Sequence, residues 1–309
     1  MNPRRSQLDA TALAAILLCC VLWGINQSAA KAALPEVPPL LQSALRSAGA
    51  TLLVLLWSRW RGIALFERDG TLRGGVLAGT LFAAEFACIF WGLQHTHASR
   101  MIVFIYLSPF VVALGMPFIT RSEGLRPMQI AGLVIAFGGV AYAFAEGFSQ
   151  PAAGPLQWLG DALGLIAAIL WGATTLAIRA TRLSSAPAEK TLFYQLAVSA
   201  VLLGAAALVA GESWPSTWSG LAVGSLTFQV VIVTFASYLL WFWLVAHYPA
   251  TRLASFTLLT PLAGLVAGML LLDEPATPRL LVGLAAVAAG IWLVNRPHRP
   301  TTPNPGTTT

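Results

Sequence analysis

The sequence predicts an all-α membrane protein in which ten transmembrane helices form two inverted five-helix repeats around a central cavity. Three observations lead to this fold class. The chain of 309 residues is 57% hydrophobic and only 10% charged, whereas a soluble domain carries roughly 25% charged residues. Its apolar segments are long enough to cross a bilayer. The motifs of its first half also recur in its second half.

The repeat is visible as a series of motifs that recur at similar sequence offsets. Residues 90–100, FWGLQHTHASR, and residues 242–252, FWLVAHYPATR, are identical at five of eleven positions, with an offset of 152. Trp23-Gly24 returns as Trp171-Gly172, at an offset of 148. Four downstream residues match four others at an offset of 151: Glu123, Pro127, Gly132 and Gly139 match Glu274, Pro278, Gly283 and Gly290. Such an internal repeat in a very apolar chain is typical of secondary transporters.

Ten segments reach or approach the roughly 20 mainly apolar residues that a helix needs to cross a bilayer. They are Ala10–Ala30, Pro38–Ser58, Gly74–His95, Ser99–Ile119, Met128–Gly147, Trp158–Ile178, Lys190–Ala210, Gly220–Val245, Arg252–Leu272 and Arg279–Asn295. We therefore expect a first repeat in residues 1–147, a linker in 148–157, a second repeat in 158–295 and a disordered cytoplasmic tail in 296–309. Because five is an odd number, the second repeat enters the membrane from the opposite side.

Basic residues predict the orientation of these segments. With the N-terminus in the cytoplasm, fourteen Lys and Arg residues fall on the inner side, and three, Lys31, Arg100 and Arg279, fall on the outer side. The excess of inner positive charge predicts that both termini are cytoplasmic, in a bacterial inner (plasma) membrane. The positive residues form no stripe, so the net charge of +6 does not indicate nucleic-acid binding. Lys31 and Arg179 close the first helix of each half and are expected to contact lipid headgroups.

The order of these motifs resembles the drug/metabolite transporter superfamily, in its EamA type. The residues that carry the resemblance are Trp23-Gly24 and Trp171-Gly172, Ala98-Ser99 to Pro109 and Ala250-Thr251 to Pro261, and Glu123 and Glu274. It covers roughly Leu13 to Val294, and departs from the family where Ser122-Glu123 and Asp273-Glu274 replace Gly-Glu. The resemblance implies a ten-helix basket that exports small metabolites, such as amino acids, or drugs.

An enzyme is the main competing class, and the sequence argues against it. None of the four Asp residues lies in the middle of a span, and neither His-Glu-x-x-His nor Gly-x-Ser-Gly occurs. Asp161 opens the sixth span, where an acid complements the helix dipole. We expect no catalytic residue, cofactor or metal site.

The expected function is therefore secondary active export of small metabolites by alternating access, with protons as a candidate coupling ion. The open alternatives are an uncoupled facilitator and a drug or small-cation exporter on the same fold. The expected partners are a small-molecule substrate and the lipid bilayer, and the sequence leaves the oligomeric state open.

Two ionisable residues lie deep within predicted spans. Arg46 is about eight residues, or roughly 12 Å, from the outer end of the second span, and Glu85 is about ten residues, or roughly 15 Å, from the outer end of the third. A charge at membrane depth normally faces a cavity or a partner. Glu85 could bind a proton or a substrate ammonium, pair with Arg46, or be buried in protonated form. Arg46 could hold a substrate carboxylate or serve as a structural anchor.

The first helix of each half also carries polar residues directly after its Trp-Gly pair. These candidate substrate-binding residues are Trp23, Asn26 and Gln27 in the first half and Trp171, Thr174 and Thr175 in the second. Each group shares one helical face by its spacing, and the alternatives are a cavity lining, hydrogen bonds between helices and core packing. Tyr106 and Tyr238 could stack on a planar substrate or pack as ordinary aromatics.

The predicted topology can be tested with reporter fusions. Because five spans separate the two positions, a reporter at Thr309 and one at Gln150 should lie on opposite sides of the membrane, with Thr309 in the cytoplasm. Paired alkaline phosphatase and fluorescent-protein fusions measure this directly. A periplasmic signal at Thr309 would contradict the orientation.

Overall fold

The computed structural model describes residues 9–120, 127–248, 253, 256–257 and 259–294. Several residues used above lie outside this part of the chain. They are the basic residues Arg4, Arg5, Arg121, Arg126, Arg252, Arg296 and Arg299, the repeat residues Ser122, Glu123, Pro249, Ala250 and Thr251, and the tail 296–309.

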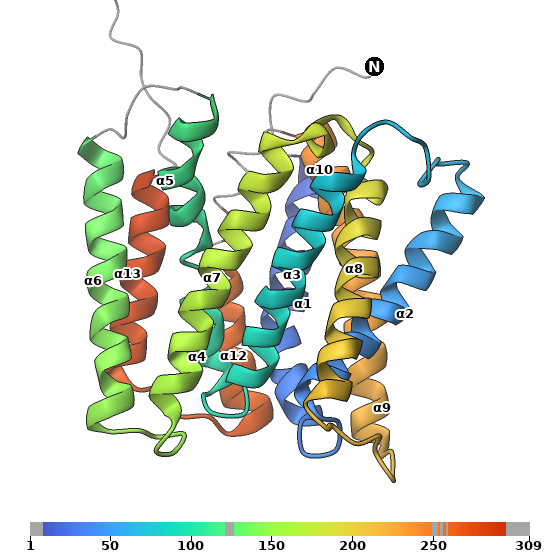
Figure 1. The fold of residues 1–309 in the computed structure, drawn as a ribbon. Helices are drawn as coiled ribbons and strands as arrows, with labels where there is room; N and C mark the ends of the chain where they lie inside the picture. Colours follow the sequence, from blue (N-terminus) through green and yellow to red (C-terminus); the bar gives the residue numbers. More distant parts are fainter. Residues whose placement is uncertain (1–8, 121–126, 249–252, 254–255, 258, 295–309) are drawn as a thin grey trace, which may run out of the picture.

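The described residues form a bundle of helices (Figure 1). Its elements are α1 (Ala10–Ala33), α2 (Pro39–Trp60), α3 (Leu72–Gly92), α4 (Ala98–Ile105), α5 (Ser108–Thr120), α6 (Pro127–Ser149), α7 (Gln157–Ala180), η1 (Arg182–Ser185), α8 (Ala188–Val209), α9 (Gly220–Thr227), η2 (Phe228–Ser237), α10 (Tyr238–His247), α12 (Leu259–Leu272) and α13 (Pro278–Val294). Within the described part of the chain, eight helical segments are long and apolar enough to cross a membrane, and α12 and α13 are shorter apolar helices. The predicted all-α membrane fold is confirmed.

Two predicted spans are not regular α-helices. The fourth is divided into α4 and α5 by a turn at Tyr106 and Leu107, directly before Pro109, which has no N–H to continue the helix. The eighth contains a π-helical segment, η2, between α9 and α10. Irregular segments of this kind occur frequently at functional sites in membrane helices.

The two repeats run in opposite directions and pack against each other. In Figure 1, α1 descends from the top of the bundle, whereas its counterpart α7 ascends from the bottom. α1 packs against α12 and the α9–α10 span, and α7 packs in the same way against α4–α5 and α3. α2 packs against α8, and α6 packs against α13. The inverted arrangement of the repeats is thereby confirmed.

Gly24 and Gly172, the glycines of the two Trp-Gly pairs, each allow a helix of the other half to pack closely. A Cβ atom at Gly24 would lie 2.6 Å from the backbone nitrogen of Gly264, and one at Gly172 would lie 2.5 Å from Val111 Cβ. Each glycine therefore has no room for a side chain where a helix of the other half crosses it. The glycines of the motif have a packing role.

A serine pair joins α2 and α8. Ser199 Oγ donates a hydrogen bond of 2.8 Å to Ser47 Oγ, and the two residues are 152 positions apart. The contact joins the second span of one repeat to the second span of the other, so α2 and α8 meet at the interface of the repeats.

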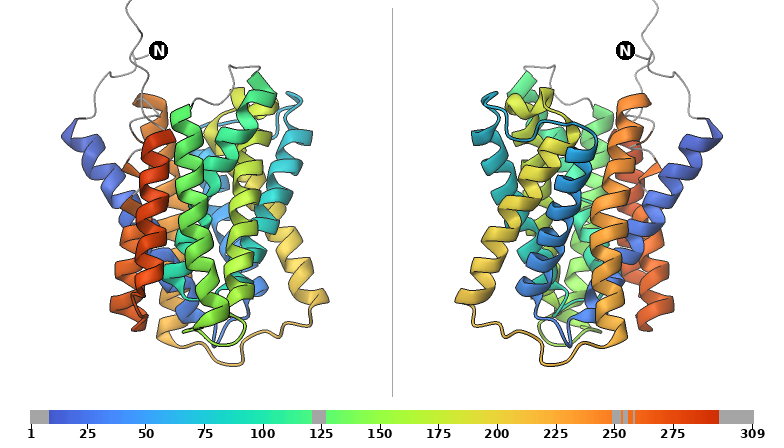
Figure 2. Two further views of the ribbon diagram at one scale, coloured as in Figure 1. Left: turned by 90° about the vertical axis from the view of Figure 1, so that its left-hand side faces the viewer. Right: turned by 90° about the vertical axis from the view of Figure 1, so that its right-hand side faces the viewer.

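The bundle has two ends, named here as they are drawn in Figure 1. The upper end is formed by the connections 61–71 and 181–187, and the lower end by 34–38, 93–97, 150–156, 210–219 and 273–277. α1 begins and α13 ends at the upper end (Figure 2). Large apolar side chains such as Val201, Leu208 and Phe118 are 71%, 81% and 88% exposed on the outside of the bundle, which suits contact with lipid acyl chains.

Small residues pack α6 against α13, and neighbouring glycines offer a matched test of this contact. A Cβ at Gly139 would overlap Ala286 Cβ, whereas a Cβ at Gly138 would meet nothing within 4 Å. Gly139→Ala should therefore lower the stability by about 1–3 kcal/mol through overpacking, and Gly138→Ala should leave it nearly unchanged. The thermal midpoint in detergent measures both, and equal midpoints for the two variants would contradict the packing.

Candidate functional site

Arg46 lies at the centre of a polar group of side chains between the two halves. Its side chain on α2 is completely buried. Nε donates a 2.7 Å hydrogen bond to Thr234 Oγ1, and Nη2 donates one of 3.3 Å to the Tyr238 hydroxyl. The guanidinium also stacks on Phe86 of α3, with Cζ 3.9 Å from the ring centroid. Three helices of both repeats thus hold one cation in a fixed orientation.

Glu85 is the nearby acid, but it is not directly paired with Arg46. It lies on α3 and is 4% exposed. Arg46 and Glu85 interact electrostatically, yet among the described residues Arg46 Nη1 and Glu85 Oε2 both lack a hydrogen-bond partner. A buried charge with unsatisfied hydrogen-bonding capacity is costly. Both groups therefore have capacity left for a ligand.

The π-helical segment η2 and the start of α10 supply most of the partners. Trp23 Nε1 donates a 2.8 Å hydrogen bond to Ser237 Oγ. The Trp23 ring meets Tyr238 edge to face, with centroids 6.4 Å apart. The sequence-based prediction named Trp23 and Tyr238, and the structure brings them together with Arg46. It missed Thr234 and Ser237.

The repeat offset contained a signal for one of these missed residues. An offset of 152 makes Ser237 the equivalent of Glu85. The position equivalent to a buried acid was therefore a candidate for the same interior. Ser237 could have been found in this way, whereas Thr234 carries no such signal.

The polar residues of α1 lie in the same interior. Asn26 and Gln27 are 6% and 8% exposed, and Asn26 Oδ1 and Gln27 Oε1 have no hydrogen-bond partner in the described part of the chain. Gln42 of α2, which the prediction also missed, is fully buried and donates from Nε2 to the carbonyl of Ala30 at 3.1 Å. The three amides are therefore gathered in the buried interior beside Arg46, and a cavity lining by Asn26 and Gln27 stays a prediction.

The corresponding residues of α7 are arranged differently. Thr174 and Thr175 donate their hydroxyl protons to carbonyls of their own helix, Leu170 at 2.8 Å and Trp171 at 3.1 Å. Trp171 packs edge to face on Tyr106, with ring centroids 5.9 Å apart. The threonine hydroxyl protons are therefore donated within α7. The rings of Trp171 and Tyr106 pack against each other in the core.

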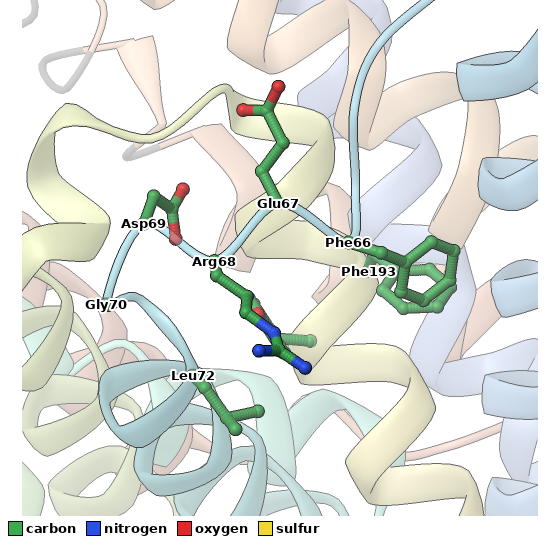
Figure 3. A pocket seen from close by; sticks show the side chains of 8 residues that line it. Phe66, Glu67, Arg68, Asp69, Gly70, Leu72 and Phe193 are labelled. Atoms are coloured by element: carbon green, nitrogen blue, oxygen red, sulfur yellow. The ribbon is translucent and has the colours of Figure 1, made fainter.

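Two surface hollows lie away from this interior. They occupy about 290 and 320 Å³ beside the connection 61–71 at the upper end. Figure 3 shows the first, where the side chains of Phe66 and Phe193 lie together and Arg68 extends alongside Leu72. None of the ten predicted site residues lines either hollow.

A second group of buried charges lies at the lower end and was not expected. Arg100, predicted to be an outer surface charge, is 1% exposed. Its Nη1 lies 2.5 Å from Glu146 Oε2, and its Nη2 lies 2.5 Å from Asp161 Oδ2. Asp161, expected to complement a helix dipole, is thus the partner of a buried guanidinium. The sequence pattern near the end of a predicted span does not distinguish a charged residue in a buried ion pair from one on the surface.

The prediction that Lys31 contacts lipid headgroups is wrong. Lys31 donates to the carbonyl of Thr96, and its Nζ lies 3.5 Å from Glu274 Oε1. The ammonium therefore faces into the lower end of the bundle. Sequence alone does not reveal this, because Glu274 is 243 positions away.

Comparisons with known proteins agree with the fold and the repeat. The model of the EamA-like transporter family matches residues 10–145 and again residues 158–296. The uncharacterized transporter YvbV of Bacillus subtilis is 30% identical over 297 residues, which cover 94% of this chain and 93% of the relative. A probable amino-acid metabolite efflux pump of Escherichia coli is 26% identical over 284 residues, which cover 90% and 92%.

One solved crystal structure matches with a TM-score of 0.61 at 18% identity, and the match covers 92% of this chain and 97% of the other. At this identity the likeness shows the fold alone. The family match, by contrast, extends over both repeats. The chain belongs to the EamA-like transporter family and is an integral membrane transporter.

Proposed function

We propose that this protein is a secondary active transporter that exports amino acids or related small metabolites across a bacterial inner membrane. Transport proceeds by alternating access, with the proton as the coupling ion and both termini in the cytoplasm. The name of the Escherichia coli relative supports the substrate class. The orientation rests on the distribution of basic residues described above.

The observation that carries this proposal is the pair of buried opposite charges with free capacity. Among the residues that the structure describes, Arg46 Nη1 is a donor without a partner, and Glu85 Oε2 is an acceptor without a partner. A zwitterion offers the complementary groups, because its carboxylate accepts from a guanidinium and its ammonium donates to a carboxylate. The aromatic rings of Trp23 and Tyr238 border the same interior and exclude water from it.

The position of the pair supports transport rather than surface binding. Both residues lie within spans, on α2 and α3, and Arg46 is bound by residues of the other repeat, Thr234 and Tyr238. Substrate sites of transporters with inverted repeats lie near the bilayer midplane at the interface of the repeats. Motion of one repeat against the other changes the partners of Arg46, which couples binding to access.

The proposed role of Glu85 is tested by Glu85→Gln. This change keeps the shape of the side chain and removes the only acid of α3, so proton-driven accumulation should be lost while the protein still folds. Amino-acid uptake into proteoliposomes, with and without a pH gradient, measures this. Cys88→Ala, one turn away on α3, is the control and should retain transport. Full gradient-driven accumulation by Glu85→Gln would reject proton coupling through Glu85 and favour an uncoupled facilitator.

Arg46 is tested by Arg46→Lys, which keeps the charge and removes the planar fork. A lysine ammonium presents its donors from a single nitrogen and cannot reproduce the geometry in which Nε and Nη2 bind Thr234 and Tyr238 while Nη1 stays available for a carboxylate, so transport of amino acids should fall at least about tenfold. Substrates that lack a carboxylate, such as amino-acid amides, should lose less. Thr234→Val is the matched variant, since it removes one partner of Arg46 and leaves the fork. An equal loss for acids and amides would contradict carboxylate recognition by Arg46.

A further inference from the structure

Carboxylates that cross between the two repeats hold the lower end of the bundle. Glu212 of the second repeat accepts from the backbone N–H groups of Leu40 and Leu41, at the start of α2. Glu36 of the first repeat accepts from the backbone N–H and hydroxyl of Ser219, at the start of α9. In each case an acid of one repeat accepts hydrogen bonds from backbone N–H groups at the N-terminus of a helix in the other repeat.

Glu274 makes the most extensive of these contacts. Its Oε1 accepts from the backbone N–H of Ala98 at 2.7 Å, and its Oε2 accepts from the N–H of Ser99 at 3.0 Å and from Ser99 Oγ at 2.7 Å. The residue lies between α12 and α13 and is 5% exposed. The carboxylate of the second repeat thus caps α4 of the first.

Basic side chains complete the site. Lys31 Nζ of α1 and His97 Nδ1 each lie 3.5 Å from Glu274 Oε1. Burial alone would raise the pKa of Glu274, but the hydrogen bonds from His97, Ser99 and Ala98 outweigh it and lower the pKa to about 2. These donors favour the ionised carboxylate, which holds α4 and α1 of the first repeat against the second repeat.

Gly268 provides the space for this carboxylate. A Cβ at Gly268 would lie 2.6 Å from Glu274 Oε2 and 3.2 Å from Ser99 Cβ. The backbone N–H of Glu274 also donates to the carbonyl of Gly268 at 3.1 Å. The missing side chain at position 268 therefore leaves room for the carboxylate where α12 meets α4.

We propose that Glu274 is the latch that closes the lower end of the transport path. Its carboxylate joins the second repeat to α4 and α1 of the first, and these contacts must break when the repeats separate at this end. This inference rests on the alternating-access part of the proposed function. The sequence repeats the same residue types at Glu123, Arg179 and Ala250-Thr251, but Glu123, Ala250 and Thr251 lie outside the described residues, so we place the latch at the lower end alone.

Two variants should release the latch by different physical routes. Glu274→Gln removes the negative charge and keeps the side-chain shape, and Gly268→Ala keeps the charge and displaces the carboxylate from α4. Each should raise the ratio of lower-end-open to lower-end-closed molecules by about tenfold, which corresponds to the loss of hydrogen bonds to a charged group. Glu67→Gln at the upper end, where the side chain is exposed, is the control and should leave the ratio unchanged.

The measurement is the distance between spin labels at Gln94 of the first repeat and Ser216 of the second, both exposed at the lower end. The labels are placed in the full-length protein with Cys19, Cys20 and Cys88 replaced by Ala, and pulsed electron resonance records the distance distribution in lipid nanodiscs without substrate. A longer-distance population should grow in both variants. Unchanged distributions in folded Glu274→Gln and Gly268→Ala would overturn the proposal.

Folding and function are separated by further measurements. Size-exclusion elution and helical circular dichroism report whether each variant folds. If one variant does not fold, Lys31→Met replaces it, because this change removes one partner of the Glu274 carboxylate. Wild-type efflux with unchanged distances in the variants rejects the latch and keeps the proposed function. A longer distance in the variants, together with a wild type inert towards amino acids, keeps the latch and rejects the substrate class.

Discussion

The absence of water in the bilayer core is the constraint on which the other features depend. Every backbone N–H and carbonyl must find a partner within the protein, so the chain crosses the membrane as helices. The same requirement applies to the first N–H groups of a helix that starts within the bundle. Here the starts of α2 and α4 are satisfied by Glu212 and Glu274, acids from the other repeat. The need to cap helices therefore also joins the two repeats.

The sequence alone predicted the fold well, because its signals are local or periodic. Long apolar segments give the spans, and the offsets of the motifs give the repeat and its inversion. The charged groups were predicted less well, because their partners are distant in sequence. Arg100 binds Asp161 from 61 positions away, and Lys31 approaches Glu274 across the two repeats. Depth within a span identified Arg46 and Glu85, whose partners only the folded chain could reveal.

The site arises where the two repeats differ. The bounds of α2 and α8 lie 149 positions apart, which makes Gln195 the equivalent of Arg46. An offset of 152, that of the third span of each half, makes Ser237 the equivalent of Glu85. The repeats thus share the glycines at which helices cross, whereas Arg46 and Glu85 have uncharged equivalents in the second repeat. A symmetric scaffold permits inverted motion, and the asymmetric side chains within it give the interior its chemistry.

The buried cations of this chain differ in how fully they are satisfied, and this difference separates their roles. All three nitrogens of the Arg100 guanidinium donate to protein acceptors, on Asp161, Glu146 and the carbonyl of Ala143. A guanidinium whose three nitrogens all have protein acceptors has less capacity for a ligand than one with a free nitrogen, and removing an acidic partner would leave a buried charge unpaired. Within the described residues, Arg46 has an unpartnered Nη1, and the nearby Glu85 has an unpartnered Oε2. Burial is costly for both Arg100 and Arg46, so burial itself does not indicate a ligand site. The free hydrogen-bonding capacity of Arg46 and Glu85 supports a site for a ligand that enters and leaves.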